Sequence, residues 1–179
     1  MVLDKNKIDS DALLAAESDS DALARLCEHY YPLILSFMHY RVHPDCAEDM
    51  TSIVFCRVVQ SIVRLKGSFN SWIYTIARNV VIDHYRYNGK RSYVVYEDGV
   101  TQNIGTSNYG VISMFNTEMD LQEILNCLDE KDRELLVLRF IQGCSSDEVA
   151  AIMDLKPGTV RAIQARLLNR LRTYYKKEV

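Results

Sequence analysis

Residues 89–117 lie near the middle of the chain and show no sustained hydrophobic period; they hold four of its seven glycines among Asn, Ser and Thr residues. This composition is typical of a flexible linker, because it offers no continuous apolar face to bury. The run Tyr-Val-Val-Tyr at residues 93–96 could pair as a short strand, but no nearby segment offers a clear partner. We therefore expect two separately folded units, residues 1–88 and residues 118–179.

The segment before the linker shows the spacing of amphipathic helices. Residues 1–20 are polar and are predicted to be frayed, with a short helix possible around Asp11–Glu17. From Asp21 an apolar face is formed by Leu23, Leu26, Cys27, Tyr30, Ile34 and Phe37. Pro32 has no N–H group and should kink this helix or divide it. Two further helices, over residues 45–65 and within residues 67–91, would complete an N-terminal helical bundle.

The segment after the linker predicts a helix-turn-helix. Ser145 and Glu148 have the spacing of a capping box and begin a short helix, and residues 154–156 form a tight turn before a longer helix that starts at Pro157. The outward cations and hydroxyl of that region are Lys156, Thr159, Arg161 and Arg166. In such a motif the second helix enters the major groove of DNA. A compact helical hairpin without a DNA role would produce a similar pattern and is the alternative. Because helices are predicted on both sides of the linker, we predict an all-α fold with two small helical domains.

Residues 67–91 carry an unusual outer face. Ile73, Ile76, Ala77, Val80 and His84 share the side expected to face a core. The opposite side mixes cations, amides and aromatic residues, and residues 67–70 precede the helix as a loop that contains Phe69. Single-stranded nucleic acid is bound by cations for its phosphates and aromatic faces for its unstacked bases. An ordinary core helix with a polar end is the alternative, and this stretch alone does not decide between the two.

An acidic face opens the helix predicted over residues 45–65. Asp45, Glu48, Asp49 and Ser52 recur at helical spacing. Carboxylates in a first helical turn are favoured by the helix dipole, by about 0.3–1 kcal/mol each, which is sufficient to explain them. A docking surface for a basic partner is the functional alternative.

Charge, cysteine content and hydropathy argue against a secreted, membrane-spanning or metal-binding protein. The formal net charge is −3, with an acidic N-terminal and a basic C-terminal segment, so a nucleic-acid role would depend on the distribution of charge. The five cysteines are odd in number and form no C-x-x-C pair, which favours reduced thiols in a cytoplasmic protein. No signal peptide or membrane-spanning stretch is apparent. We expect no cofactor and no metal, because the His and Cys spacings lack a zinc-finger pattern.

Three segments together resemble a bacterial RNA polymerase sigma factor of the extracytoplasmic-function (ECF) group. The first, HYYPLILSFMHYRVHPDCAEDMTSIVFCRVV, has the Tyr-Tyr-Pro and the Ala-Glu-Asp of that family. The second, FNSWIYTIARNVVIDHYR, has its Trp and Ile-Ala-Arg-Asn. The third, ELLVLRFIQGCSSDEVAAIMDLKPGTVRAIQARLLNRLR, is similar to its fourth conserved region. The three occur in the family's order and are divided by a linker.

The resemblance implies a division of labour within an all-α protein. Core RNA polymerase would be bound, at the clamp helices of its largest subunit, by Asp45, Glu48 and Asp49. The minus-ten promoter element would be melted and a flipped base held by Ser68, Phe69, Asn70, Trp72, Tyr74, Thr75, Arg78, Asn79 and Arg86. The minus-35 element would be bound by Lys156, Thr159, Arg161 and Arg166. An anti-sigma factor or another inhibitor is an implied partner, and the linker would thread the polymerase cleft.

Some positions depart from the family. Ser52 stands where Gln is common, and residues 161–166, Arg-Ala-Ile-Gln-Ala-Arg, replace the group's frequent Lys-Ser-Arg-Leu-His-Arg with a pattern more like that of primary sigma factors. Near the start of the last helix, Pro157, Gly158 and Ala162 have little with which to read bases. Recognition of the minus-35 element would therefore depend on phosphates and DNA shape.

Two other kinds of binding protein are alternatives to a sigma factor. A sigma-mimicking adaptor would bind an anti-sigma factor without acting on DNA, but such adaptors are usually fused to a receiver domain. A stand-alone helix-turn-helix repressor would leave the acidic face and residues 67–91 without a purpose. An enzyme is not predicted, because the chain has no Gly-rich phosphate loop, nucleophile elbow or H-E-x-x-H motif.

Overall fold

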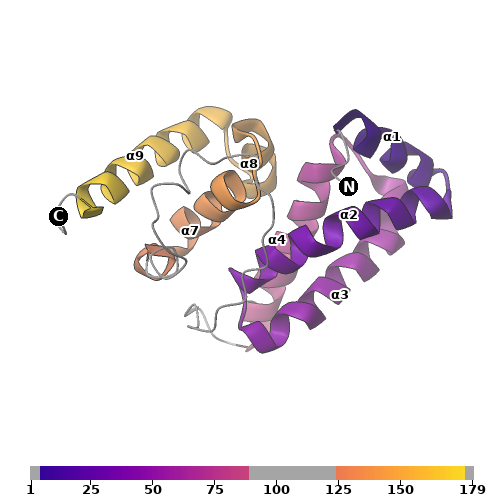
Figure 1. Ribbon diagram of the computed structural model, residues 1–179, viewed down its shortest axis with the longest axis horizontal. Helices are drawn as coiled ribbons and strands as arrows, with labels where there is room; N and C mark the ends of the chain where they lie inside the picture. The colour runs from indigo at the N-terminus through magenta and orange to yellow at the C-terminus, as the bar shows by residue number, and fades with distance from the viewer. Residues whose placement is uncertain (1–4, 89–123, 176–179) are drawn as a thin grey trace. The chain divides into compact units, whose positions relative to one another are not determined.

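The computed structural model describes residues 5–88 and 124–175, and the chain divides into two compact units, Met1–Tyr93 and Val94–Val179 (Figure 1). Within the described ranges every regular element is helical, which confirms the predicted all-α class. The predicted linker, residues 89–117, lies outside the described residues.

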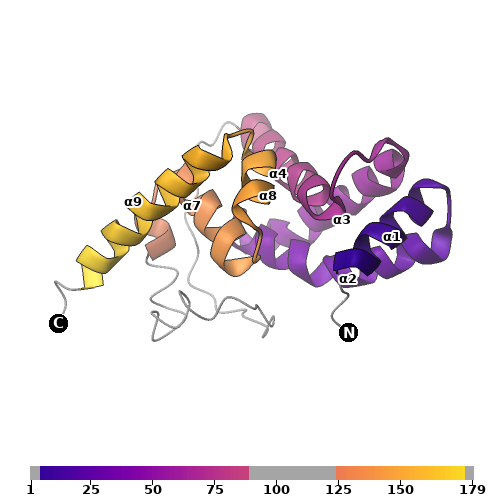
Figure 2. The ribbon, with the colours of Figure 1, turned by 90° about the horizontal axis from the view of Figure 1, so that it is seen from above.

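The N-terminal unit is a bundle of four α-helices and a short 3₁₀ turn. The elements are α1 (Lys5–Ala16), α2 (Ser20–His39), α3 (Pro44–Ser61), the 3₁₀ turn η1 (Ile62–Arg64) and α4 (Phe69–Asn88). Helix α2 packs against both α1 and α3, and α3 packs against α4. Figure 2 shows α1 running beside α2. None of the helices in the described part of the chain is long and apolar enough to cross a membrane.

Aromatic side chains join α2 to α4 in the middle of this bundle. Tyr30 meets Phe69 edge to face, with ring centroids 5.1 Å apart, and Phe37 meets Tyr74 at 5.7 Å. All four side chains are fully buried, together with Leu26, Ile34, Met38 and Ile73. Large rings of this kind contribute most of the area buried in a small core, so these contacts fix the position of α4.

Helix α2 confirms most of the face predicted for it, since Leu26, Tyr30, Ile34 and Phe37 are buried. The helix is continuous through Pro32 and is not divided. Pro32 lies on the exposed side, where water can satisfy the carbonyl group that would otherwise accept its missing N–H.

The prediction that residues 1–20 are frayed was wrong for α1. Ile8, Ala12 and Ala15 are buried, and Asp11 is only 4% exposed. The Arg25 side chain of α2 donates two hydrogen bonds to the Asp11 carboxylate, at 2.6 and 3.2 Å. This hydrogen bonding is the main reason that the pKa of Asp11 is lowered from its ordinary value, against the opposing effect of burial.

The C-terminal unit contains the helix-turn-helix that the sequence predicted. After a helical segment at residues 124–127 come α7 (Glu130–Leu136), the π-helical turn η2 (Val137–Ile141), α8 (Ser146–Met153) and α9 (Pro157–Tyr175). Gly143 follows α7 and η2 and turns the chain with a φ of +70°, and Asp154 turns the chain after α8 with a φ of +54°. Asp is one of the few residues besides Gly that adopts this left-handed conformation readily.

One apolar core holds these C-terminal helices together. Its fully buried side chains come from every element of the unit and include Leu125, Leu135, Leu136, Leu138, Val149, Val160 and Leu167. On α9, Ile163 and Leu168 are half-buried. Helix α9 therefore lies with one apolar stripe on the core.

The capping box of α8 provides a test of the fold. The Ser145 hydroxyl accepts a hydrogen bond from the Glu148 N–H, and the Glu148 carboxylate accepts one from the Ser145 N–H. We expect Ser145→Ala to lower the free energy of unfolding by about 1 kcal/mol, because an orphan amide loses its acceptor. Urea denaturation measures this, with Ser146→Ala as the control at the next position. An equal loss in both variants would contradict the assignment.

Candidate nucleic-acid interface

The loop before α4 is shorter than the sequence indicated. Helix α4 begins at Phe69, so that only Gly67 and Ser68 remain of the predicted loop at residues 67–70. Gly67 adopts a φ of +78°, a conformation strained for other residues, and turns the chain into the helix. Phe69 and Asn70 are therefore fixed in the first helical turn and are not parts of a loop.

The burial of Phe69 and Tyr74 corrects the prediction that they offer their rings to nucleic acid. Each side chain is 1% exposed and lies against an aromatic ring of α2. Starting the helix at Phe69 places it one turn before Ile73, on the core face, and Tyr74 follows on the same side. Their rings support the helix from within.

The other residues predicted to bind the minus-ten element begin just before α4 and continue to its middle. The Asn70 side-chain oxygen accepts a hydrogen bond of 3.2 Å from the Tyr30 hydroxyl. The half-buried Trp72 has its ring centroid 5.7 Å from that of Phe69, at an interplanar angle of 47°. Ser68 and Arg78 are also half-buried, whereas Asn79 is exposed. An amide, an indole and a guanidinium group thus lie along the start and middle of α4.

Further along α4, the outer face is less open than the sequence suggested. The Thr75 hydroxyl donates to the Ser71 carbonyl at 2.7 Å, and the Tyr85 hydroxyl donates to the Arg41 carbonyl at 2.8 Å. Tyr85 is therefore half-buried, while Ile82 and Tyr87 are exposed at 37% and 92%. The exposed aromatic and apolar groups concentrate near the end of the helix.

Arg86 forms an ion pair with a neighbour on its own helix. Its Nη2 atom lies 3.2 Å from the Asp83 carboxylate, which also receives Arg57 of α3 at 3.1 Å. The Arg86 side chain is 80% exposed. Exposed pairs of this kind contribute only about 0–1 kcal/mol, so Arg86 can exchange Asp83 for a phosphate at low cost.

The acidic face on α3 is open to solvent. Asp45, Glu48, Asp49 and Ser52 are all exposed along the first two turns. His43 caps the helix by accepting the Asp45 N–H at 3.3 Å, and Pro44 occupies the first helical position. Burial lowers the pKa of His39 at the end of α2, and the nearby Glu48 charge partly offsets the shift. These carboxylates are held on a rigid helix.

Apolar side chains that were not predicted as a surface feature continue the acidic face along α3 and into η1. The ring of Phe55 stacks on Tyr31 of α2 with centroids 5.7 Å apart. Val59 and Val63, one and two turns later, are 55% and 65% exposed. Their spacing from Ser52 in steps of three or four residues was the available signal. The exposed side of α3 thus changes from acidic to apolar along its length.

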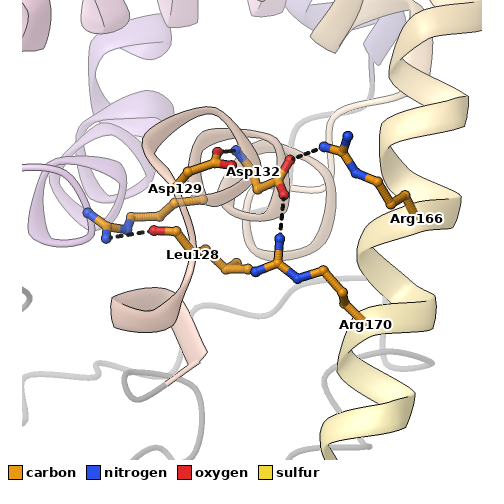
Figure 3. Close-up of polar contacts among 6 residues, drawn as sticks. Leu128, Asp129, Asp132, Arg166 and Arg170 are labelled. Atoms are coloured by element: carbon orange, nitrogen blue, oxygen red, sulfur yellow. Dashed lines mark hydrogen bonds and ion pairs between the residues drawn. The ribbon is translucent and has the colours of Figure 1, made fainter.

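Polar residues at the start of α9 and further along it differ in their surroundings. Lys156, Thr159 and Arg161 are exposed around the first turn of the helix. Arg166, in contrast, lies 3.0 Å from the carboxylate of Asp132 on α7, and Arg170 lies 3.2 Å from the other oxygen of the same group (Figure 3). Asp132 is 2% exposed and was not identified from the sequence. Arg166 is thus outward, as predicted, with its side chain 63% exposed, but it is also paired with a buried carboxylate.

Within the described ranges, no group of three or more His, Cys, Asp and Glu side chains is arranged to hold a metal ion. The chemistry of the candidate sites is that of charges, amides and aromatic rings on rigid helices. It suits binding to nucleic acid and protein surfaces.

Comparisons with known families match both units. Residues 26–91 match the family described as Sigma-70 region 2, and residues 118–173 match that described as Sigma-70, region 4. The chain is 30% identical over 173 residues to the ECF RNA polymerase sigma factor ShbA of Streptomyces griseus, with 88% of this chain and 90% of ShbA covered. It is also 30% identical to BldN of Streptomyces coelicolor, of which it spans 61%, over 88% of its own length.

Solved structures show the same fold. CnrH, in complex with the cytosolic domain of CnrY, matches with a TM-score of 0.69 at 19% identity, over 98% of this chain and 100% of CnrH. The sigma factor RpoE of Bartonella quintana, in complex with the anti-sigma factor NepR, matches with a TM-score of 0.65 at 23% identity, over 86% and 96%.

Trp72 allows a direct test of the α4 surface, because it is the one tryptophan of the chain. We expect a single-stranded DNA oligonucleotide to quench its fluorescence, since a base stacked on the half-exposed indole changes its surroundings. The Arg161→Gln variant, altered in the other unit, should retain the full quenching. Unchanged emission at DNA concentrations that saturate binding would contradict a base-stacking site at Trp72.

Proposed function

We propose, because the chain belongs to the family of ECF RNA polymerase sigma factors, that it binds core RNA polymerase and directs it to specific promoters. The observation that carries this proposal is the match of both units, in order, to regions 2 and 4 of the sigma-70 proteins. The proposed partners are core polymerase and promoter DNA, and the chain would supply recognition and melting rather than catalysis.

The acidic face of α3 is the proposed site of polymerase binding. Asp45, Glu48 and Asp49 would meet the clamp helices of the largest polymerase subunit. Their exposure on one rigid helix supports this role, since charges presented to a partner steer association and fix orientation. The exposed apolar residues Val59 and Val63 extend the same side of α3 and would add buried area to the contact.

The start of α4 is the proposed site of minus-ten recognition. Extruding a base from the duplex costs a few kcal/mol, and stacking it on an aromatic group returns about 1–3 kcal/mol. Trp72 offers a partly exposed ring for this stacking. Ser68 and Asn70, near the start of α4, would bind base edges. Phe69 and Tyr74 would contribute by holding these groups in place from the core.

The remaining polar groups of α4 would bind the displaced strand. Thr75, Arg78, Asn79 and Arg86 lie in this order along α4, away from the base site. The weak, exposed Arg86–Asp83 pair supports a phosphate contact here, because a phosphate can replace the carboxylate with little loss.

Helix α9 is the proposed reader of the minus-35 element. Lys156, Thr159 and Arg161 lie at its N-terminal turns, the part of a recognition helix that enters the major groove. Backbone contacts and DNA shape would dominate, since Pro157, Gly158 and Ala162 present little to base edges.

A protein inhibitor is a further proposed partner. The solved structures of CnrH and of RpoE are complexes, the first with a fragment of CnrY and the second with the anti-sigma factor NepR. We propose that an inhibitor of this kind restrains the present chain, and that the exposed side of α3 is part of what it would cover.

Two single substitutions should separate polymerase binding from duplex opening. We expect Glu48→Gln to weaken binding to core polymerase about tenfold, because one exposed charge of the docking face is lost, and to leave the opening activity of the assembled complex unchanged. Glu28→Gln, an exposed acid on α2, is the matched control. Fluorescence anisotropy with labelled protein measures core binding.

In the reverse direction, Asn79→Ala should reduce promoter opening, measured by permanganate reactivity of unpaired thymines, and retain normal core binding. Arg78→Ala should act in the same way, with circular dichroism to confirm folding because Arg78 is half-buried. If Asn79→Ala instead weakened core binding as strongly as opening, the proposed site on α4 would be misplaced.

A further inference from the structure

Two arginines of α9 share one buried acceptor on α7. Arg166 donates from Nη2 to Oδ1 of Asp132 at 3.0 Å, and Arg170 donates from Nη1 to Oδ2 at 3.2 Å. The arginines are one helical turn apart, so both reach the same carboxylate (Figure 3). Each carboxylate oxygen thus has its own guanidinium partner.

Asp132 is fixed in place from its own side. Its N–H donates to the Asp129 side chain at 2.8 Å, which caps α7 and places Asp132 in the first turn. Its side chain is 2% exposed, whereas those of Arg166 and Arg170 are 63% and 51% exposed. The group is therefore a buried anion that meets two cations at the surface.

Among the described residues, Arg166 and Arg170 are the cations paired with Asp132. Arg133, the next residue, donates to the carbonyl oxygens of Leu125 at 2.7 Å and Leu128 at 3.2 Å. Removing both arginines would leave a buried carboxylate without its charge partners, which is strongly unfavourable.

We propose that Asp132 retains Arg166 and Arg170 as partners within the protein and withholds them from DNA phosphates, so that α9 binds DNA with Lys156 and Arg161 near its N-terminus. This inference rests on the proposed function, because it assumes that α9 meets DNA. It makes Asp132 a determinant of how many phosphates the helix contacts. The pairing of Asp132 also differs from the exposed Asp83–Arg86 pair of α4, because the Asp83 carboxylate is partly exposed to solvent.

The number of phosphates contacted is measurable from salt dependence. Each phosphate neutralised by a cation contributes about −0.9 to the slope of log K against log salt concentration for duplex DNA. A cation already neutralised by Asp132 displaces few counterions from DNA and should contribute little. The slope therefore distinguishes arginines that bind phosphate from those that bind the protein.

The test compares two exposed arginines of the same helix in the full chain. Binding to a labelled duplex oligonucleotide of arbitrary sequence is followed by fluorescence anisotropy over a series of salt concentrations. We expect Arg161→Gln to reduce the magnitude of the slope by about 0.9 and Arg166→Gln to leave it unchanged. Both substitutions remove one positive charge from α9, so they differ only in the contact made by the lost side chain.

Releasing the arginines should have the opposite effect. We expect Asp132→Asn to increase the magnitude of the slope by about 1 to 2, because up to two cations become available to phosphates. Asp147→Asn, at an exposed acid of α8, controls for the change in net charge and should leave the slope as it is. If circular dichroism shows that Asp132→Asn is unfolded, the two arginine variants decide the question.

The outcomes separate this inference from the proposed function. If Arg166→Gln lowers the slope as much as Arg161→Gln, or a folded Asp132→Asn leaves it unchanged, the role of Asp132 is refuted while DNA binding by α9 stands. If neither Arg161→Gln nor Lys156→Ala changes the slope, the proposed DNA face of α9 is wrong and the inference fails with it.

Discussion

The packing of α4 against α2 is the constraint on which the N-terminal unit depends. Tyr30 and Phe37 of α2 meet Phe69 and Tyr74 of α4 within the core. Because these rings fix both the position and the rotation of α4, they decide which of its side chains reach solvent. The Tyr30 hydroxyl also holds Asn70, so the core directly orients a group of the proposed minus-ten site.

The helices were largely predictable from the sequence, because their apolar spacing, the Pro44 start and the Ser145–Glu148 capping box act locally. The assignment of individual side chains near a helix start was less predictable. A start of α4 at Phe69 turns that residue from a loop aromatic into a core residue. Spacing alone places a boundary residue poorly, since one position changes its direction by a large part of a turn.

The buried pairing of Asp132 could not be predicted from the sequence. Asp132 lies 34 and 38 residues before its two arginine partners, and an acid in a first helical turn is ordinarily explained by the helix dipole. Charge counting therefore treated Arg166 as available to DNA. In the folded unit, basic residues of one helix are divided between stabilising the protein and meeting its ligand, and that division depends on tertiary contacts.

Run-off transcription with purified core RNA polymerase and a library of genomic fragments tests the central claim most directly. We expect the chain, freed of any inhibitor, to bind core polymerase and to start transcripts at a limited set of promoters that core polymerase alone does not use. Failure of the folded, inhibitor-free chain to bind core polymerase, or binding without any promoter-specific transcript, would contradict it.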